Sequence, residues 1–174
     1  MADESQPRPR RWGVVAASAA LAASVIAAGV FGVSWASAAN SDSTSFATER
    51  DNALEAGRQG VVNFHTLDYR DVQRGLDLWV ESSTGPLRDE VQRGRQANAE
   101  RIQQAKTVTE GKVLDAALTE LDERAGKAMM IAVVEFTATP EGQQPAVKRT
   151  RYQVELTRDG DRWKLSNLGA VAVG

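Results

Sequence analysis

The longest apolar stretch of the chain lies near its N-terminus. Residues Gly13 to Ala39 carry no charge over 27 positions, and a bilayer-spanning helix needs about 20 apolar residues. Trp12 and Trp35 lie near the two ends of this stretch. On a helix they would be about 34 Å apart, close to the hydrocarbon thickness, and Trp at both interfaces is typical of membrane spans. We therefore predict a transmembrane anchor over residues 12–39.

The charges around this stretch predict its orientation. Arg8, Arg10 and Arg11 directly precede it, whereas the first basic residue after it is Arg50. Because positive charge stays on the cytoplasmic side, residues 1–11 are predicted to be a cytoplasmic tail and the C-terminal part to be extracytoplasmic. The alternative is a cleaved secretory signal, since Ala36-Ser37-Ala38 satisfies the small-x-small rule. The apolar run exceeds the 7–15 residues of a signal core, which favours the anchor in the cell membrane.

Small residues recur at every fourth position of the predicted span. They are Ala16, Ala20, Ser24, Ala28, Gly32 and Ala36. Such a ridge lets membrane helices approach closely, so it is a hypothesis for helix pairing. The span is rich in Ala, Gly and Ser throughout, and a ridge of this kind also arises by chance.

After a polar joint over residues 40–45, the pattern becomes helical. Apolar residues at helical spacing predict a first helix from Phe46 to Phe64, a second from Asp68 to Trp79 and a third from Pro86 to Ala105. Gly85 and Pro86 separate the second helix from the third.

Beyond Lys106 the pattern alternates, as in β-strands. We predict strands over Thr107–Leu118, Lys127–Ala138, Arg149–Arg158 and Arg162–Val171, with a hairpin turn at Asp159-Gly160. The strand over Lys127–Ala138 is apolar on both faces. In the last two strands the alternation predicts that Tyr152, Val154, Leu156, Trp163 and Leu165 face inward. Helices followed by a meander of strands predict an α+β domain over residues 46–174, in which helices cover one face of an antiparallel sheet.

Composition excludes several kinds of chemistry. The chain has no cysteine, so disulfides, Cys-based zinc sites and thiol nucleophiles are absent. The formal net charge is −2, and this mild acidity argues against a nucleic-acid partner. No glycine-rich phosphate-binding motif is present, and we expect no cofactor and no metal.

Three features could still carry a function. His65 is the only histidine and is more often a packed or surface residue than an acid–base group. Glu135 interrupts an apolar strand, either as an acid in a cavity or as a water-facing residue near a strand end. Lys148, Arg149 and Arg151 form a basic cluster that could bind lipid headgroups or an acidic partner, or could be a solvated strand edge.

The order of the parts also suggests a family. The segments that carry the likeness are Glu49 to Ala56, Thr66 to Val72, Thr84 to Glu90, Thr109 to Gly111 and Arg158 to Leu165. With the basic tail and the single apolar helix, they resemble the actinobacterial, mycobacterial-type Mce-associated membrane proteins. The resemblance covers about residues 10–170.

This resemblance implies a fold like the nuclear-transport-factor/SnoaL cone, with three helices on a curved sheet of about four strands. It also implies a non-enzymatic accessory role in Mce complexes, which carry lipids across the cell envelope. Mce subunits and the membrane would then be the partners, with lipid as a ligand.

Two alternatives remain open. A cone-fold enzyme or lipid-binding module would need His65, Tyr69 or Glu135 to point into a closed pocket. A secretion-system scaffold is the other, because type IV secretion systems use a similar combination of anchor and cone.

Overall fold

The computed structural model describes residues 44–171 of the chain. The predicted anchor with Trp12 and Trp35, the ridge of small residues and the basic tail lie outside the described residues. Within residues 44–171, no helix combines the length and the apolar character that crossing a bilayer requires.

Helices precede strands along the described chain. Residues 44–65 are helical, and we call this segment the long helix. It is followed by β1 (Leu67–Asp68), α2 (Val72–Ser82), α3 (Gly85–Arg93), α4 (Arg95–Ala105), β2 (Thr107–Asp122), β3 (Lys127–Pro140), β4 (Ala146–Asp159) and β5 (Arg162–Val171).

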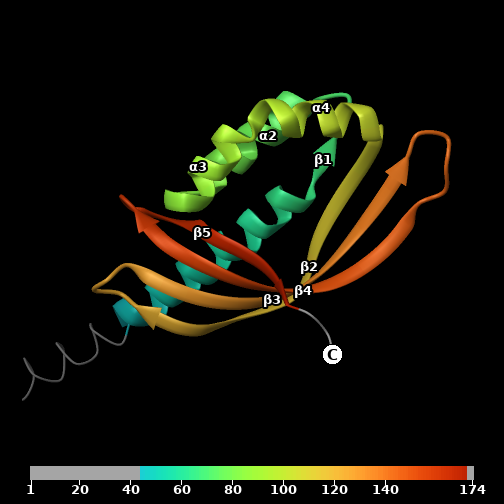
Figure 1. The fold of residues 1–174 in the computed structure, drawn as a ribbon. Helices are drawn as coiled ribbons and strands as arrows, with labels where there is room; N and C mark the ends of the chain where they lie inside the picture. Colours follow the sequence, from blue (N-terminus) through green and yellow to red (C-terminus); the bar gives the residue numbers. More distant parts are fainter. Residues whose placement is uncertain (1–43, 172–174) are drawn as a thin grey trace, which may run out of the picture. The chain divides into compact units, whose positions relative to one another are not determined.

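The five strands form one antiparallel sheet in the order β1-β2-β3-β4-β5. The sheet is strongly curved, and α2, α3 and α4 lie on one side of it (Figure 1). The long helix packs against the same side, since Gly57 approaches Met130 and Leu156. This arrangement confirms the predicted α+β domain with helices on one face of an antiparallel sheet.

The core lies between the long helix and the inner face of the sheet. Its buried residues are Ala53, Val61, Ala128, Met130, Ala132, Val134, Val154, Leu156, Trp163 and Leu165. On the long helix the buried positions are small, and Gly57 and Gly60 let the backbone approach the sheet closely. A Cβ atom at Gly57 would lie only 2.8 Å from Met130 Sδ. Phe46, by contrast, is 48% exposed.

The prediction for the second helix was wrong at its N-terminus. Leu67 and Asp68 pair with Thr109 and Val108 to form β1, so the chain is extended there. The Asp68 carboxylate then accepts a hydrogen bond from the Arg70 backbone N–H at 2.9 Å. Such side-chain bonds favour turns over helix, and α2 accordingly begins at Val72.

The predicted third helix is divided in two. α3 and α4 meet at Gly94, whose N–H donates to the Glu90 carbonyl at 2.9 Å, while Asn98 N–H donates to the Gly94 carbonyl at 2.8 Å. Glycine weakens a helix interior by about 1 kcal/mol relative to alanine, which favours the break here. The described residues thus hold four helices and five strands, against three and about four predicted.

The predictions for the sheet hold better. β5 has the predicted bounds, and the turn at Asp159-Gly160 is confirmed, with Gly160 at φ 64°. β2 is longer than predicted because it continues past a register irregularity near Thr119; a second irregularity, near Leu114, lies within the predicted bounds. The inner residues Tyr152, Val154, Leu156, Trp163 and Leu165 were predicted to face inward.

Candidate functional site

His65 lies at the end of the long helix, against the inner face of the sheet. Its ring is 4.7 Å from the ring of Tyr152 and 5.8 Å from that of Phe136. Its Nδ1–H donates to the Val61 carbonyl at 2.8 Å. Burial lowers the pKa of His65, and the bond to Val61 opposes this shift. These contacts are those of a neutral, packed histidine that joins the long helix to β3 and β4.

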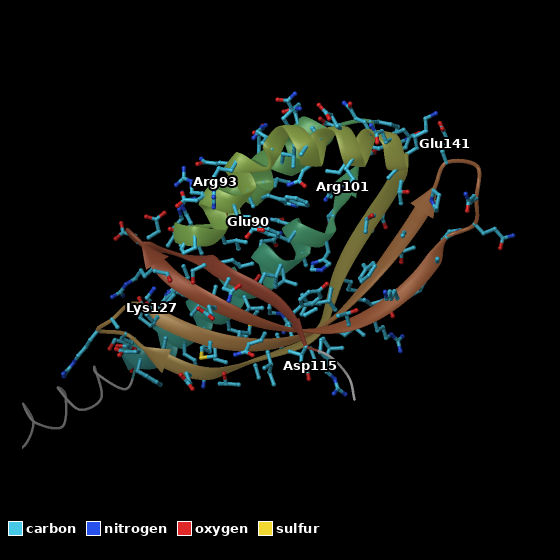
Figure 2. The ribbon with its side chains drawn as sticks, viewed as in Figure 1. Glu90, Arg93, Arg101, Asp115, Lys127 and Glu141 are labelled. Carbon is cyan, nitrogen blue, oxygen red and sulfur yellow. The ribbon has the colours of Figure 1, made fainter. Side chains whose placement is uncertain are left out.

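Tyr69 lies elsewhere, beside the turn that connects β3 and β4. Its hydroxyl donates to Glu141 Oε1 at 3.0 Å, and Lys106 Nζ donates to Glu141 Oε2 at 2.8 Å. The hydrogen bond from Lys106, followed by that from Tyr69, lowers the pKa of Glu141. Figure 2 shows Glu141 at the end of the β3–β4 hairpin. This cluster ties the hairpin to the end of α4.

Glu135 lies on the outer face of the sheet, which we define as the face opposite the helices. It accepts a hydrogen bond from Arg149 Nε at 2.7 Å, and its side chain is 24% exposed. His65, Tyr69 and Glu135 therefore occupy three separate places and do not form one pocket. The basic cluster is divided too, because Lys148 points to the inner face and Arg149 and Arg151 to the outer one.

Other chemistry is scarce in the described part of the chain. Between residues 44 and 171, no three His, Asp or Glu side chains are grouped so that they could hold a metal ion. A hollow of about 290 Å³ lies instead on the outer face of the sheet. It is lined by Asp115, Ala117, Ile131, Val133, Arg151 and Val171, among others.

The register of the sheet explains this hollow, because residues paired across antiparallel strands point to the same face. One row across the outer face contains Asp115, Val133, Arg151 and Val171. The next contains Ala117, Ile131, Gln153 and Gly169, and the third contains Glu120, Met129, Glu155 and Asn167. In the middle row Ala117 is small, which leaves room beside the Ile131 side chain on the β2 side, whereas Gln153 lies on its β4 side.

Two charges of opposite sign border the hollow. Asp115 on β2 and Arg151 on β4 lie on either side of Val133. Figure 2 shows Asp115 on the side of the sheet away from α3 and α4. Ile131 is 52% exposed and Val171 is 43% exposed. An exposed apolar surface with a charged border is typical of an interaction site.

This site was missed at the level of sequence, although one signal was present. Met129, Ile131 and Val133 alternate with the core residues of β3, which makes the strand apolar on both faces. In a sheet covered on one face only, the second apolar face requires a further explanation. Asp115 and Arg151 had no such signal, because only the strand register brings them to one row.

Two comparisons relate the sequence to known proteins. A family described as "Uncharacterized protein Rv1363c/MT1408-like" matches residues 14–172. The uncharacterized protein Rv1363c of Mycobacterium tuberculosis is 29% identical over 126 residues, which cover 70% of this chain and 48% of the relative. The chain thus spans about half the length of the curated relative that it matches.

Solved structures of two other proteins have a similar architecture. An IcmL-like type IV secretion system protein from Legionella pneumophila matches with a TM-score of 0.58 at 10% identity, over 72% of this chain and 94% of that one. The periplasmic domain of DotI matches with a TM-score of 0.57 at 10% identity, over 69% and 93%. At such identity the likeness concerns the fold alone.

Proposed function

The chain belongs to the family described as "Uncharacterized protein Rv1363c/MT1408-like", and from this premise we propose that it is a non-enzymatic subunit of a multiprotein assembly in the cell envelope. The observation that carries the proposal is the open apolar surface on the outer face of the sheet, where Ile131 is half exposed next to the row that contains Asp115, Val133 and Arg151. A surface of this kind is stabilised by covering it with another protein.

The fold supports this role. The IcmL-like protein is described as part of a type IV secretion system, and the DotI fragment as a periplasmic domain. A similar domain in this chain would lie outside the cytoplasm, tethered by the anchor predicted over residues 12–39. A scaffold also needs no catalytic group, in keeping with the separation of His65, Tyr69 and Glu135.

The specific assembly that we propose is an Mce-type lipid-import complex. The segments around Thr66-Leu67-Asp68-Tyr69-Arg70 and Thr84-Gly85-Pro86-Leu87 resemble Mce-associated membrane proteins, and a mycobacterial relative matches the chain. The subunit would stabilise or assemble the transporter through its nuclear-transport-factor/SnoaL-like domain, its anchor or both. Lipid would be the cargo of the complex.

Affinity purification tests this proposal. The full-length chain with a C-terminal tag is purified from solubilised mycobacterial-type membranes, next to an unrelated single-pass protein with the same tag. We expect Mce subunits to co-purify with this chain and not with the control. If repeated purifications after mild cross-linking recover no Mce subunit, the Mce assignment is wrong.

A secretion scaffold is the second candidate function, and the match to the IcmL-like type IV secretion system protein favours it. The same purification separates the two candidates, because secretion or conjugation subunits would be recovered in place of Mce subunits. The identity of the adjacent genes gives an independent test.

A further inference from the structure

The apolar surface of the outer face follows one strand. Met129, Ile131 and Val133 point outward from β3, and we call these three residues the β3 strip. Since β3 is central in the sheet, with β2 and β4 on either side, the β3 strip lies in the middle of the face. The hollow of about 290 Å³ beside Ile131 can receive a protruding apolar side chain.

The two borders of the β3 strip differ in charge. On β2, the acidic residues Asp115 and Glu120 lie beside Val133 and Met129, whereas β4 carries the basic residue Arg151 beside Val133 and the acidic residue Glu155 beside Met129. Within residues 44–171, none of these four charged side chains forms an ion pair with another described residue. Their charges are therefore available to a binding partner.

The dimensions of the β3 strip favour a peptide segment over a second copy of this sheet. From residue 129 to residue 133 the strip is about 13 Å long, at about 3.3 Å per residue, and the four strands around it span about 14 Å. The resulting area of about 190 Å² is far below the roughly 800 Å² per partner of a stable protein–protein interface.

The position of the β3 strip also selects the conformation of the segment. A bound strand needs backbone hydrogen bonds at a free sheet edge, and β3 is paired on both sides along residues 129–133. A segment that lies on the face must satisfy its own backbone, as a helix does. About nine helical residues, or two to three turns, match the length of the strip.

We propose that the outer face docks an amphipathic helix of a partner protein in the envelope assembly. Its apolar stripe covers Met129, Ile131 and Val133. Acidic residues on one flank of the helix face Arg151, and basic residues on its other flank face Asp115 and Glu120. This inference deepens the proposed function, on which it rests, by stating the chemistry of the partner.

Synthetic peptides serve as the probes. Three fluorescent amphipathic helices share the same leucine stripe: one has glutamate on one flank and lysine on the other, one has glutamate on both flanks, and one has lysine on both. Fluorescence anisotropy measures their binding to the full-length protein in lipid nanodiscs, and binding to empty nanodiscs is subtracted. We expect the mixed-flank peptide to bind most tightly.

Substitutions in the chain then locate the site. Ile131→Asp should weaken binding of the mixed-flank peptide about tenfold or more, as expected for a central interface residue. Val147→Ser is the matched control, because Val147 is also an exposed β-branched residue, 62% exposed, but lies outside the β3 strip. We expect this control to leave the affinity unchanged.

Two charge variants test the borders in a way that loss of folding cannot imitate. Arg151→Glu makes both borders acidic, so preference should shift to the peptide with lysine on both flanks. Asp115→Lys places a basic residue on each side of Val133, because Arg151 lies on the other side. This variant should therefore bind the peptide with glutamate on both flanks in preference to the other two. We expect each preferred peptide to bind about fivefold more tightly than the mixed one, as for favourable rim charges.

Several results would overturn the proposal. Equal affinity for the three peptides, or an effect of Val147→Ser as large as that of Ile131→Asp, would exclude this site. A dimer of the full-length protein that Ile131→Asp abolishes would assign the face to a second copy. Loss of binding to anionic lipid vesicles in Ile131→Asp, without peptide binding by the parent, would assign it to a membrane surface. The peptide assay contains no Mce or secretion subunit, so its failure is separate from failure of the co-purification.

Discussion

The close approach of the long helix to β5 predicts that Gly60→Ala destabilises the fold, although the same change strengthens an isolated helix. Gly60 is buried, and an added Cβ would collide with Cδ1 of Leu165. Leu165 is itself fully buried in the core. The new methyl group therefore has no space unless the helix, the strand or the Leu165 side chain moves.

The magnitude follows from two opposing effects. Replacing a glycine inside a helix by alanine stabilises it by about 1 kcal/mol. Forcing an extra methyl group into a packed core costs about 1–3 kcal/mol, and sometimes more. Because the collision at Gly60 is with a side chain that has no exposed surface, we expect the cost to dominate. The net change in the free energy of unfolding should be a loss of about 1–2 kcal/mol.

A double-mutant cycle with Leu165→Ala isolates the contact. Leu165→Ala alone should cost about 3–5 kcal/mol, as for other buried leucines. In the double variant the methyl group added at position 60 enters the space that Leu165 vacates, and the helix gains its propensity without the collision. The double variant should therefore be less destabilised than the sum of the single variants, by about 2 kcal/mol. Urea unfolding of the full-length protein, followed by tryptophan fluorescence, measures all three changes.

The control is Gly169→Ala, because a Cβ at Gly169 meets no atom within 4 Å. It removes a glycine from a strand without a collision and should be neutral or mildly stabilising. Two results would refute the close packing of the long helix on β5. One is that Gly60→Ala stabilises the protein by the full ~1 kcal/mol expected for alanine in a helix. The other is that the free-energy changes of Gly60→Ala and Leu165→Ala add to that of the double variant within about 0.5 kcal/mol.

Three further outcomes follow from the described contacts. Glu49→Ala should lower the free energy of unfolding by about 1–2 kcal/mol, because it leaves the Nε1–H of Trp163 without its 3.0 Å partner, whereas Glu49→Gln should retain most of the stability in thermal melts. Burial lowers the pKa of His65 in the folded protein, so the unfolded chain takes up a proton first as the pH falls. The free energy of unfolding should therefore decline as the pH falls below about 6.5, the ordinary pKa of histidine, and His65→Gln should abolish this decline in urea titrations. The hydrogen bond from Lys106 lowers the pKa of Glu141 from its ordinary value of 4.5, so the stabilisation that Glu141 provides should be present above pH 4.5 and lost on acidification. Lys106→Ala removes this bond and should speed hydrogen exchange in the β3–β4 hairpin.

Local patterns predicted the elements whose signals lie close together along the chain. The alternation in β4 and β5 placed Val154 and Leu165 on the inner face, and both lie in the core. The turn at Gly160 followed from its dipeptide alone. Each depends on backbone preferences and on neighbours two to four residues away, which a sequence displays directly.

Contacts between distant segments decided the remainder. Leu67 and Asp68 are extended because β2 pairs with them, some 40 residues further along the chain. The likeness to a cone-shaped enzyme suggested a pocket with His65 and Glu135, but the strand faces separate them. Glu135 points outward to Arg149, whereas His65 packs on the inner rings of Phe136 and Tyr152.

The sequence by itself therefore determined the order of helices and strands, the inward faces of β4 and β5 and the exclusion of thiol chemistry. The tertiary structure alone decided which residues share a surface. Asp115, Val133 and Arg151 form one row only because β2, β3 and β4 pair in a particular register. Strand register is set by core packing and by irregularities such as the shift near Leu114, and these arise only once the helix and the sheet are assembled.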